Sequence, residues 1–402
     1  MKIVLITTGQ PSVNPRVVKE ADALTSAGHD VIVLFSFWIQ WANEADVKLL
    51  SHVKWAYKLI GGSPNKNKAI YFFTRARFLI CKELNKKFGN KHWFAERAQA
   101  RCFNELLQAA QSLKATWYIG HNLGALAVAV IAAEFQDASA GFDFEDYHRE
   151  ENTDMLQYEH QRIVYLEEKY IPRLNYVSTA SSLITAKVKQ HFPFFSKPLI
   201  TLLNCFSLAQ QPSFNQKADN DNTLNLFWFS QTVGTNRGLE LVLNALKALN
   251  DESIFLTLVG RCTTETKESF QRMAGGAKRN IHFAGIVEPV KIINIAATMD
   301  IGLALEPSIP INRDICLTNK IFTYLLAGNA VILSDTSMQK LFNEKYNIGQ
   351  CIEGNQALSL AEKIKTYKNK KILNAQRQHN YQLAHQLFNW EHESKKLLQL
   401  LS

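Results

Sequence analysis

The forty residues from Ala296 to Asp335 constrain the fold more than any other part of this chain. They read as a buried strand (Ile301 to Leu305), a polar loop, a helix beginning near Thr318, a glycine stop at Gly328 and a second buried strand (Ala330 to Leu333). This order is typical of half a doubly wound parallel sheet. In such sheets ligands bind outside the carboxyl ends of the strands, where a helix N-terminus offers unpaired amides to an anion.

Alternating strand and helix patterns run through both halves of the chain. The first half begins with the strand KIVLITT, a helix from Asn14 to Ala27 and the strand HDVIVLFSF, and continues with a helix around Ala98 to Leu113, the strand TWYIGH and the helix GALAVAVIAAEF. The second half begins afresh with the strand LNLFWFS and the helix GLELVLNALKAL. We therefore predict an α/β protein with two doubly wound, Rossmann-like domains that face each other across a cleft.

A polar segment with few apolar anchors separates the two halves and is typical of a linker. The predicted division is an N-terminal domain at residues 1–206 with a basic aromatic insertion at 36–110, a linker at 207–223, a C-terminal domain at 224–385, and a C-terminal helix at 386–402 that packs back toward the N-terminal domain.

Composition predicts a folded cytoplasmic protein. The 402 residues are 47% apolar, and the start MKIVLITTG reads as a first strand because no small-residue cleavage site follows it. The longest apolar helical stretch, Ala125 to Ala133, is far short of the roughly 20 residues that span a bilayer. Six scattered cysteines lack CxxC pairs, which argues against a disulfide framework or a zinc site.

One segment carries the positive charge. Between Lys48 and Arg101 there are 13 Lys or Arg residues and two acids, whereas the whole chain has a net charge of +9. Apolar residues recur at helical spacing within this segment, at Ile70, Phe73, Ala76, Ile80 and Leu84. Two interpretations stay open: a helix that touches an anionic membrane surface, or a core-facing helix with a solvated basic face. We expect no nucleic-acid partner, because no recognisable binding module is present.

Polar residues in the first half mark candidate site positions. Asn14-Pro15-Arg16 opens the first helix, and a cation at its second position opposes the helix dipole unless an anion docks nearby. A solvated Arg16 explains the local sequence equally well. His121 ends the strand TWYIGH, where a ligand would bind, although a lone histidine is more often structural.

An acidic cluster follows Gly141. It is either a solvated charged loop or the source of a carboxylate that activates or orients an acceptor hydroxyl. Its members are Asp143, Glu145, Asp146, His148, Glu150 and Glu151.

In the second half, FSQTVGTNRGLE follows a strand and opens a helix, so Arg237 would point toward a phosphate held at the helix mouth. Arg313 and Lys320 bring further cations to the mouth of the helix that begins near Thr318. An ordinary strand, loop and helix without a ligand would show the same local pattern.

The block NKIFTYLLAGNAVILSD resembles the donor-site signature of family 4 of the retaining glycosyltransferases, in which a nucleotide sugar packs against the helix. The start N-P-R-x-x-K-E-A, His121, the pair Arg237-Gly238 and the terminal FNWEHE extend the resemblance over nearly the whole chain. It implies the GT-B architecture. By motif position it implies catalytic roles for His121, Asp143 and Glu145, acceptor binding by Gly9, Asn14 and Arg16, and donor binding by Gln231, Thr232, Arg237, Gly238, Arg313, Thr318, Asn319, Lys320 and Thr323.

The chain departs from the family pattern at several positions. Ile119 replaces the first histidine of the H-A-H-D type motif, and the first of two diphosphate-binding cations is missing near Gln231. The family carries two glutamates eight positions apart, and Ile315 and Thr323 stand in their places.

The resemblance implies transfer of a sugar from a nucleoside diphosphate sugar to a glycan or lipid-linked acceptor, with retention and without metal or cofactor. The triplet Asp219-Asn220-Asp221 matches the D-x-D metal motif of another glycosyltransferase architecture, but it lies in the polar linker, so we expect no metal there. The missing glutamates motivate an alternative, a non-catalytic nucleotide-sugar-binding or partner subunit. The basic segment motivates another, a membrane or nucleic-acid scaffold.

Overall fold

A computed structural model describes residues 1–218, 220–354 and 356–401, and it divides the chain into two compact units. The first unit comprises Met1–Leu202 together with the residues from Ser394 onward, and the second comprises Leu203–Glu393. The first acid of the linker triplet, Asp219, lies outside the described residues. The described part of the linker is irregular apart from a short 3-10 helix at Leu208–Gln210.

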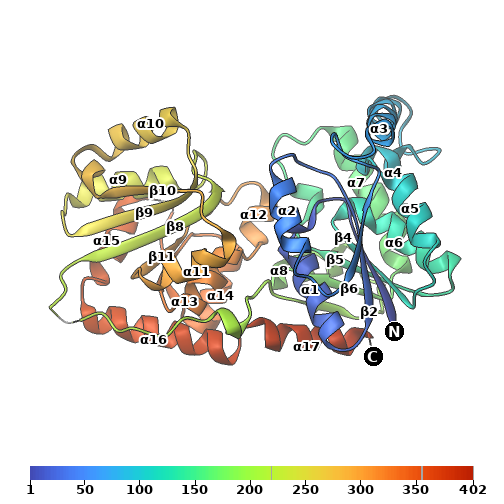
Figure 1. Ribbon diagram of the computed structural model, residues 1–402. Helices are drawn as coiled ribbons and strands as arrows, with labels where there is room; N and C mark the ends of the chain where they lie inside the picture. The colour runs from blue at the N-terminus through green and yellow to red at the C-terminus, as the bar shows by residue number, and fades with distance from the viewer. Residues whose placement is uncertain (219, 355, 402) are drawn as a thin grey trace. The chain divides into compact units, whose positions relative to one another are not determined.

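The first unit contains a seven-stranded, all-parallel sheet in the order β3-β2-β1-β4-β5-β6-β7. Helices cover both of its faces (Figure 1). The strands are β1 (Lys2–Thr7), β2 (Asp30–Ser36), β3 (Ala56–Ile60), β4 (Trp117–His121), β5 (Ser139–Phe144), β6 (Tyr176–Thr179) and β7 (Leu199–Thr201). The helices are α1 (Pro15–Ser26), α2 (Ala42–Leu50), α3 (Lys68–Phe88), α4 (Phe94–Gln99), α5 (Phe103–Gln111), α6 (Leu123–Phe135), α7 (Gln157–Tyr170) and α8 (Ser182–His191).

The second unit contains a six-stranded parallel sheet in the order β10-β9-β8-β11-β12-β13, again with helices on both faces (Figure 1). The strands are β8 (Leu224–Thr232), β9 (Ile254–Arg261), β10 (Ile281–Gly285), β11 (Ile301–Ala304), β12 (Ala330–Leu333) and β13 (Gly349–Cys351). The helices are α9 (Leu239–Leu249), α10 (Thr264–Ala274), α11 (Pro289–Ala297), α12 (Ile311–Ile315), α13 (Asn319–Ala327), α14 (Ser337–Tyr346), α15 (Ala357–Thr366) and α16 (Lys370–Gln386). Helix α17 (Trp390–Leu401) begins in the second unit and belongs to the first from Ser394 onward.

These two sheets confirm the predicted fold class of two doubly wound α/β domains. The block that led to the prediction forms β11, α13 and β12, and β11 and β12 are parallel neighbours. Thr318 is the N-cap of α13, and Gly328 ends it with a φ of 72°, a left-handed backbone conformation that glycine adopts without strain. The polar loop before α13 holds the short helix α12, which the sequence pattern did not predict.

The helix predicted around Ala98 to Leu113 is confirmed over Phe103–Gln111, but its predicted beginning is wrong because a break separates α5 from the shorter helix α4. Helix α4 ends at Gln99, Ala100 is extended with a φ of −127°, and α5 begins at Phe103. Cys102, between the two helices, lies where a side chain at Gly61 would be: a Cβ added to that glycine would stand 2.2 Å from the Cys102 sulfur. The break therefore lets the chain pack closely against the loop that follows β3.

Hydrophobic pattern and burial agree in α6 but not in α3. Helix α6 is apolar on all sides and lies buried against β4 and β5, as expected for a helix in the middle of an α/β unit. The apolar stripe predicted in α3 faces solvent instead: Ile70, Phe73 and Ile80 are exposed. The interpretation of α3 as a core-facing helix is therefore wrong for this stripe. Among the described residues, no helix is both long and apolar enough to cross a membrane.

Candidate functional site

The first group of candidate residues lies at the switch point of the seven-stranded sheet. The chain runs from β1 to β2 on one side of β1, and β4 then joins β1 on the other side. At such a point the loops that leave neighbouring strands diverge and open a crevice at their carboxyl ends. Gly9 follows β1, His121 ends β4, and Asp143 and Glu145 lie at the end of β5. The parallel topology thus gathers these predicted positions at one edge.

Helix α1 begins at this edge of the sheet, and Arg16 is the second residue of its first turn. Asn14 is the N-cap, and its side-chain oxygen accepts a hydrogen bond from the Val17 amide at 3.3 Å, while Pro15 occupies the first helical position. Arg16 is buried and donates from Nε and Nη2 to the two carboxylate oxygens of Asp143, at 2.6 and 2.5 Å. Its third bond, from Nη1, reaches the Leu202 carbonyl at 3.0 Å. The anion beside Arg16 is therefore a carboxylate of this chain.

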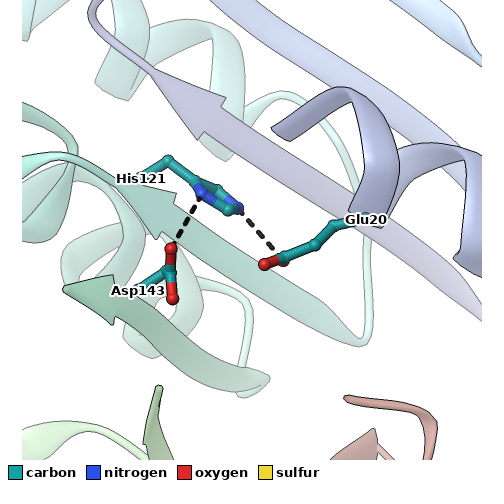
Figure 2. A group of neighbouring side chains, drawn as sticks. All are labelled: Glu20, His121 and Asp143. Atoms are coloured by element: carbon teal, nitrogen blue, oxygen red, sulfur yellow. Dashed lines mark ion pairs between the residues drawn. The ribbon is translucent and has the colours of Figure 1, made fainter. Parts of the chain in front are cut away.

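His121 lies between carboxylates on both sides of its ring (Figure 2). Its Nε2 is 3.2 Å from Glu20 of α1, and its Nδ1 is 3.2 Å from Glu145 and 3.7 Å from Asp143. The Nε2 contact lacks the angle of a well-formed hydrogen bond, so we treat it as an ion pair. His121, Glu20 and Asp143 are each at most 1% exposed.

This arrangement keeps the imidazole protonated. Burial lowers the pKa of His121, but the charges of Glu20 and Asp143 and the hydrogen bond to Glu145 outweigh burial and raise the pKa to about 10. For the Asp143 carboxyl, burial acts in the opposite direction and would raise the pKa, but the Arg16 guanidinium holds that pKa below its ordinary value. Ser178 supports the same carboxylate with a hydrogen bond of 2.7 Å. The cluster is thus a set of buried charges that compensate one another.

Glu145 is the carboxylate of this cluster that reaches the surface. Its side chain is 21% exposed, whereas those of Glu20 and Asp143 are 1% and 0% exposed. Two donors hold its Oε1: Asn14 Nδ2 at 2.6 Å and His121 Nδ1 at 3.2 Å. Gly9 lies at the same strand edge, half-buried, and its amide donates to the Thr7 hydroxyl at 3.2 Å. The buried residues therefore orient one accessible carboxylate.

Glu20, His121 and Asp143 also have the spacing of a metal site, because one ligand atom from each lies within 4.8 Å of the others. The chemistry of the three side chains fits a metal less well than the spacing does. A protonated imidazole has no lone pair for a cation. Asp143 already binds the Arg16 fork with both oxygens. A divalent ion would have to displace the His121 proton and repel the guanidinium.

Sequence reasoning missed Glu20, although the quoted start N-P-R-x-x-K-E-A contains it. Glu20 lies four positions after Arg16, so both side chains lie on the same side of α1. A buried acid four residues after a buried base is a signal that the helix periodicity alone could have supplied.

The second group of candidate residues lies at the switch point of the six-stranded sheet, where β9 and β11 flank β8. The loops after β8 and β11 approach each other closely. Gly238 has a φ of +77°, and a Cβ added there would stand 2.8 Å from the Cβ of Leu305. Only glycine combines this backbone conformation with that clearance. The predicted pair Arg237-Gly238 and the residues after β11 therefore meet at one edge.

Arginines line this edge with weakly held guanidinium groups. Arg237 is half-buried, and its Nη1 donates to the Ser230 hydroxyl at 2.8 Å. Arg313, from α12, donates to the carbonyl of Asn236 at 3.1 Å, which brings it next to Arg237. Both of these acceptors are neutral oxygens. Gln231 and Thr232 lie exposed at the end of β8 beside them.

Lys320 brings a third cation to the edge from the first turn of α13. Its Nζ forms an ion pair with Glu306, and it also lies 5.4 Å from the centre of the Trp228 ring. The side chains of Lys320 and Glu306 are 13% and 12% exposed. Glu306 directly follows Leu305, which lies against Gly238. The ion pair of Lys320 and Glu306 is therefore close to the point where the loops after β8 and β11 meet. Arg237, Arg313 and Lys320 thus lie at the same carboxyl edge of the six-stranded sheet, and their role in donor binding stays a prediction.

The remaining predicted donor residues divide by exposure. Thr318 and Asn319 are half-buried at the start of α13, and the Thr318 hydroxyl has no hydrogen-bond partner in the described part of the chain. Thr323 is 1% exposed, and its hydroxyl donates to the Asn319 carbonyl at 3.1 Å. The structure therefore does not bring the Thr323 hydroxyl to the edge.

Neither residue that replaces a family glutamate offers a carboxylate, and both residues are buried. Ile315 is 5% exposed in α12, and Thr323 is the buried residue just described. Asp314, the neighbour of Ile315, accepts a hydrogen bond from the Ser337 amide at the start of α14, at 2.9 Å. Glu306 lies at this edge, and so does Glu240, which accepts a hydrogen bond from the Asn236 amide at 2.9 Å.

No protein-family profile matches this chain, and no curated protein sequence does. Solved structures do match it over its full length. HepE of Anabaena in complex with UDP and glucose has a TM-score of 0.70 at 15% identity, covering 100% of this chain and 99% of that chain. Sucrose-phosphate synthase of Thermosynechococcus elongatus has a TM-score of 0.68 at 12% identity, covering 100% and 98%.

TarM of S. aureus, solved with UDP, alpha-GlcNAc-glycerol and Fondaparinux, has a TM-score of 0.65 at 11% identity and covers 100% of this chain and 99% of that chain. At these identities the likeness concerns the backbone arrangement alone. The chain has the fold of the GT-B glycosyltransferases.

Proposed function

We propose that this protein is a glycosyltransferase that transfers a sugar from a nucleoside diphosphate sugar to a glycan or lipid-linked acceptor. The observation that carries the proposal is the meeting of Arg237, Arg313 and Lys320 at the switch point of the second unit, beside the N-terminus of α13. Cations and helix amides at one edge suit a diphosphate, whose developing charge they would stabilise as the sugar leaves. HepE, which shares the fold, was solved with UDP-glucose.

On the first unit, Glu145 is proposed to contact the acceptor hydroxyl. Its partial exposure and its two donors, Asn14 and His121, support this role. His121, Asp143 and Arg16 then act as positioning residues, because their polar atoms face one another. Gly9 is proposed to leave room for the acceptor at the same edge.

We further propose that the enzyme belongs to the retaining family 4, needs no metal, and works in the cytoplasm with an acceptor presented at an anionic membrane surface. The motif order in the sequence supports the family. Three basic side chains at the proposed diphosphate site support catalysis without a metal. The anomeric configuration of the product, read by NMR, distinguishes retention from inversion.

The loss of both family glutamates favours one alternative, a subunit that binds nucleotide sugars without transferring them. Thermal shifts with nucleoside diphosphates and their sugars test the step that both functions share, because a ligand that binds the folded state raises the melting temperature. A shift with one nucleoside diphosphate that Arg237→Ala abolishes is the expected result. The absence of any shift across the nucleotide panel would refute the proposal.

A further inference from the structure

Helix α3 covers its unit with one face and exposes a largely apolar face on the other side. Tyr71, Thr74, Cys81 and Asn85 are buried, and the helix packs against α4 and α7. At 100° per residue the opposite face is centred near Ala76. It is formed by Phe72 (59% exposed), Phe73 (63%), Leu79 (54%) and Ile80 (59%), together with the exposed Ala76.

Cations flank this apolar face along one side. Lys68, Arg75, Lys82 and Lys86 follow one another at intervals of seven, seven and four residues, so they share one side of the helix. Glu83, the acid of α3, and Lys87 lie on the same side of the helix as the apolar face, beyond its C-terminal end. Arg77 belongs to a different group, because it forms two hydrogen bonds to Glu105 at 2.9 and 2.6 Å and is held within the unit.

We propose that α3 docks in the plane of an anionic lipid bilayer, with its apolar face in the interface and its cationic side against the lipid phosphates. The apolar face runs from Phe72 to Ile80 of this 21-residue helix and is therefore about 12 Å long. Large apolar side chains enter the boundary of the acyl chains, while flanking Lys and Arg side chains reach the headgroups. Contiguous exposed apolar residues rarely occur on a soluble surface without such a role.

Charge complementarity selects this occupant over another copy of the chain. The flanking cations would repel the same cations on a second α3 helix, whereas anionic headgroups attract them. A nucleic acid would use the cations but gains little from burying Leu79 and Ile80. The biological purpose of the docking, delivery of a lipid-linked acceptor, rests on the proposed function. Binding of α3 to lipid does not, because it requires no nucleotide-sugar donor.

Sedimentation with vesicles of phosphatidylcholine alone, or with a third of phosphatidylglycerol, tests the docking of the full chain. Wild type is expected to partition onto the anionic vesicles and to dissociate as salt rises. Phe72→Ser with Phe73→Ser and Ile80→Ser should reduce partitioning by about tenfold or more, and so should conversion of the four flanking cations to Gln.

Matched controls come from exposed residues elsewhere in the chain. Phe135→Ser with Phe194→Ser removes side chains that are 67% and 96% exposed, and should leave partitioning unchanged. Conversion of four exposed cations of the second unit to Gln controls for net charge, at Lys278, Arg279, Lys365 and Lys371. Melting temperatures equal to that of wild type show that each variant is folded.

Equal partitioning onto neutral and anionic vesicles would overturn the proposal, and so would wild-type binding by the apolar variant. A concentration-dependent dimer that the apolar substitutions dissolve would also overturn it, because a second copy would then cover α3. Binding of nucleoside diphosphate is measured on the same proteins without lipid. If the wild type binds nucleoside diphosphate but no anionic vesicles, the docking alone is refuted. If the wild type binds anionic vesicles but no nucleoside diphosphate, the proposed function alone is refuted.

Discussion

The two switch points of this protein occupy equivalent places in their sheets but arrange charge in opposite ways. In the first unit, Arg16 and His121 are buried and paired with carboxylates of the same unit. In the second unit, Arg237 and Arg313 are half-buried and donate to neutral oxygens. A bidentate carboxylate satisfies a guanidinium fork, whereas a single hydroxyl leaves most of its donors available.

This difference indicates that the buried charges of the first unit stabilise the fold, whereas the half-buried cations of the second unit are available to bind a ligand. Buried charges that compensate one another fix geometry, and removing one leaves its partner uncompensated. Half-buried cations with neutral partners keep electrostatic capacity for an incoming anion. We therefore expect substitutions in the first unit to cost stability, and substitutions in the second unit to cost binding.

The largest effect is expected from Asp143→Asn. It leaves the buried Arg16 without its anion, and breaking a buried ion pair in this way costs about 3 to 5 kcal/mol. Urea unfolding of the first unit measures the loss. Asp335→Asn is the matched control, because its partner Lys340 lies at the surface, and it should move the unfolding midpoint far less. Equal shifts for the two variants would contradict the assignment of Asp143.

Arg237→Ala should weaken binding of the nucleoside diphosphate by about 1.5 to 3 kcal/mol, roughly ten- to 150-fold, because it removes a charge-assisted contact. The unfolding midpoint should stay close to that of wild type. Calorimetric titration measures the affinity, with the exposed Arg279→Ala as control. Unchanged affinity in the folded Arg237 variant would remove this residue from the site.

The stability of the first unit should fall as pH rises above neutral. The folded pKa of His121 is about 10 against an ordinary value of 6.5, so the folded state binds a proton that the unfolded state releases. This contribution is fully present below pH 6.5 and is lost as pH rises through 10, at no more than about 1.4 kcal/mol per pH unit.

Unfolding free energies of wild type and His121→Gln, compared at pH 7 and pH 8, isolate this slope. The wild type should lose about 1.2 kcal/mol more than the variant over that interval. Parallel pH profiles for the two proteins would show that His121 is not held as the charged form.

The smallest effect is expected from Glu306→Gln. The Glu306 carboxylate neutralises Lys320, so its removal should strengthen binding of the free diphosphate by about threefold, the scale of one partly exposed pair. Lys320→Gln should act in the opposite direction. Calorimetric titration at two salt concentrations measures both. Weaker binding by Glu306→Gln would show that this acid contacts the ligand or holds Lys320 in place.

The sequence predicted what depends on local periodicity. The β11, α13 and β12 unit and the helix start at Thr318 follow from patterns within short segments. The buried cluster did not follow, because Arg16 and Asp143 are 127 positions apart and meet only after β1, β4 and β5 have paired. The sequence therefore did not show that the anion beside Arg16 is Asp143 of the same chain, and an external anion was one of the two interpretations.

The surroundings of the α3 stripe and of Thr323 could not be predicted either, because they also depend on tertiary packing. The apolar spacing of α3 predicted a stripe, but spacing does not say whether protein or another medium covers it. Thr323 falls on the position of a family glutamate, but only the fold shows that its hydroxyl bonds to its own helix. Local pattern specifies elements, and tertiary packing decides what each side chain meets.

Turnover is the measurement that tests the central claim most directly. The nucleotide sugar whose nucleoside diphosphate gives the largest thermal shift is incubated with membrane extract as acceptor, with excess chelator, and release of the nucleoside diphosphate is followed. We predict acceptor-dependent release by wild type that survives chelation and falls with Arg237→Ala. Tight binding without any release, at every acceptor and with metal restored, would contradict the claim and identify a non-catalytic nucleotide-sugar-binding subunit.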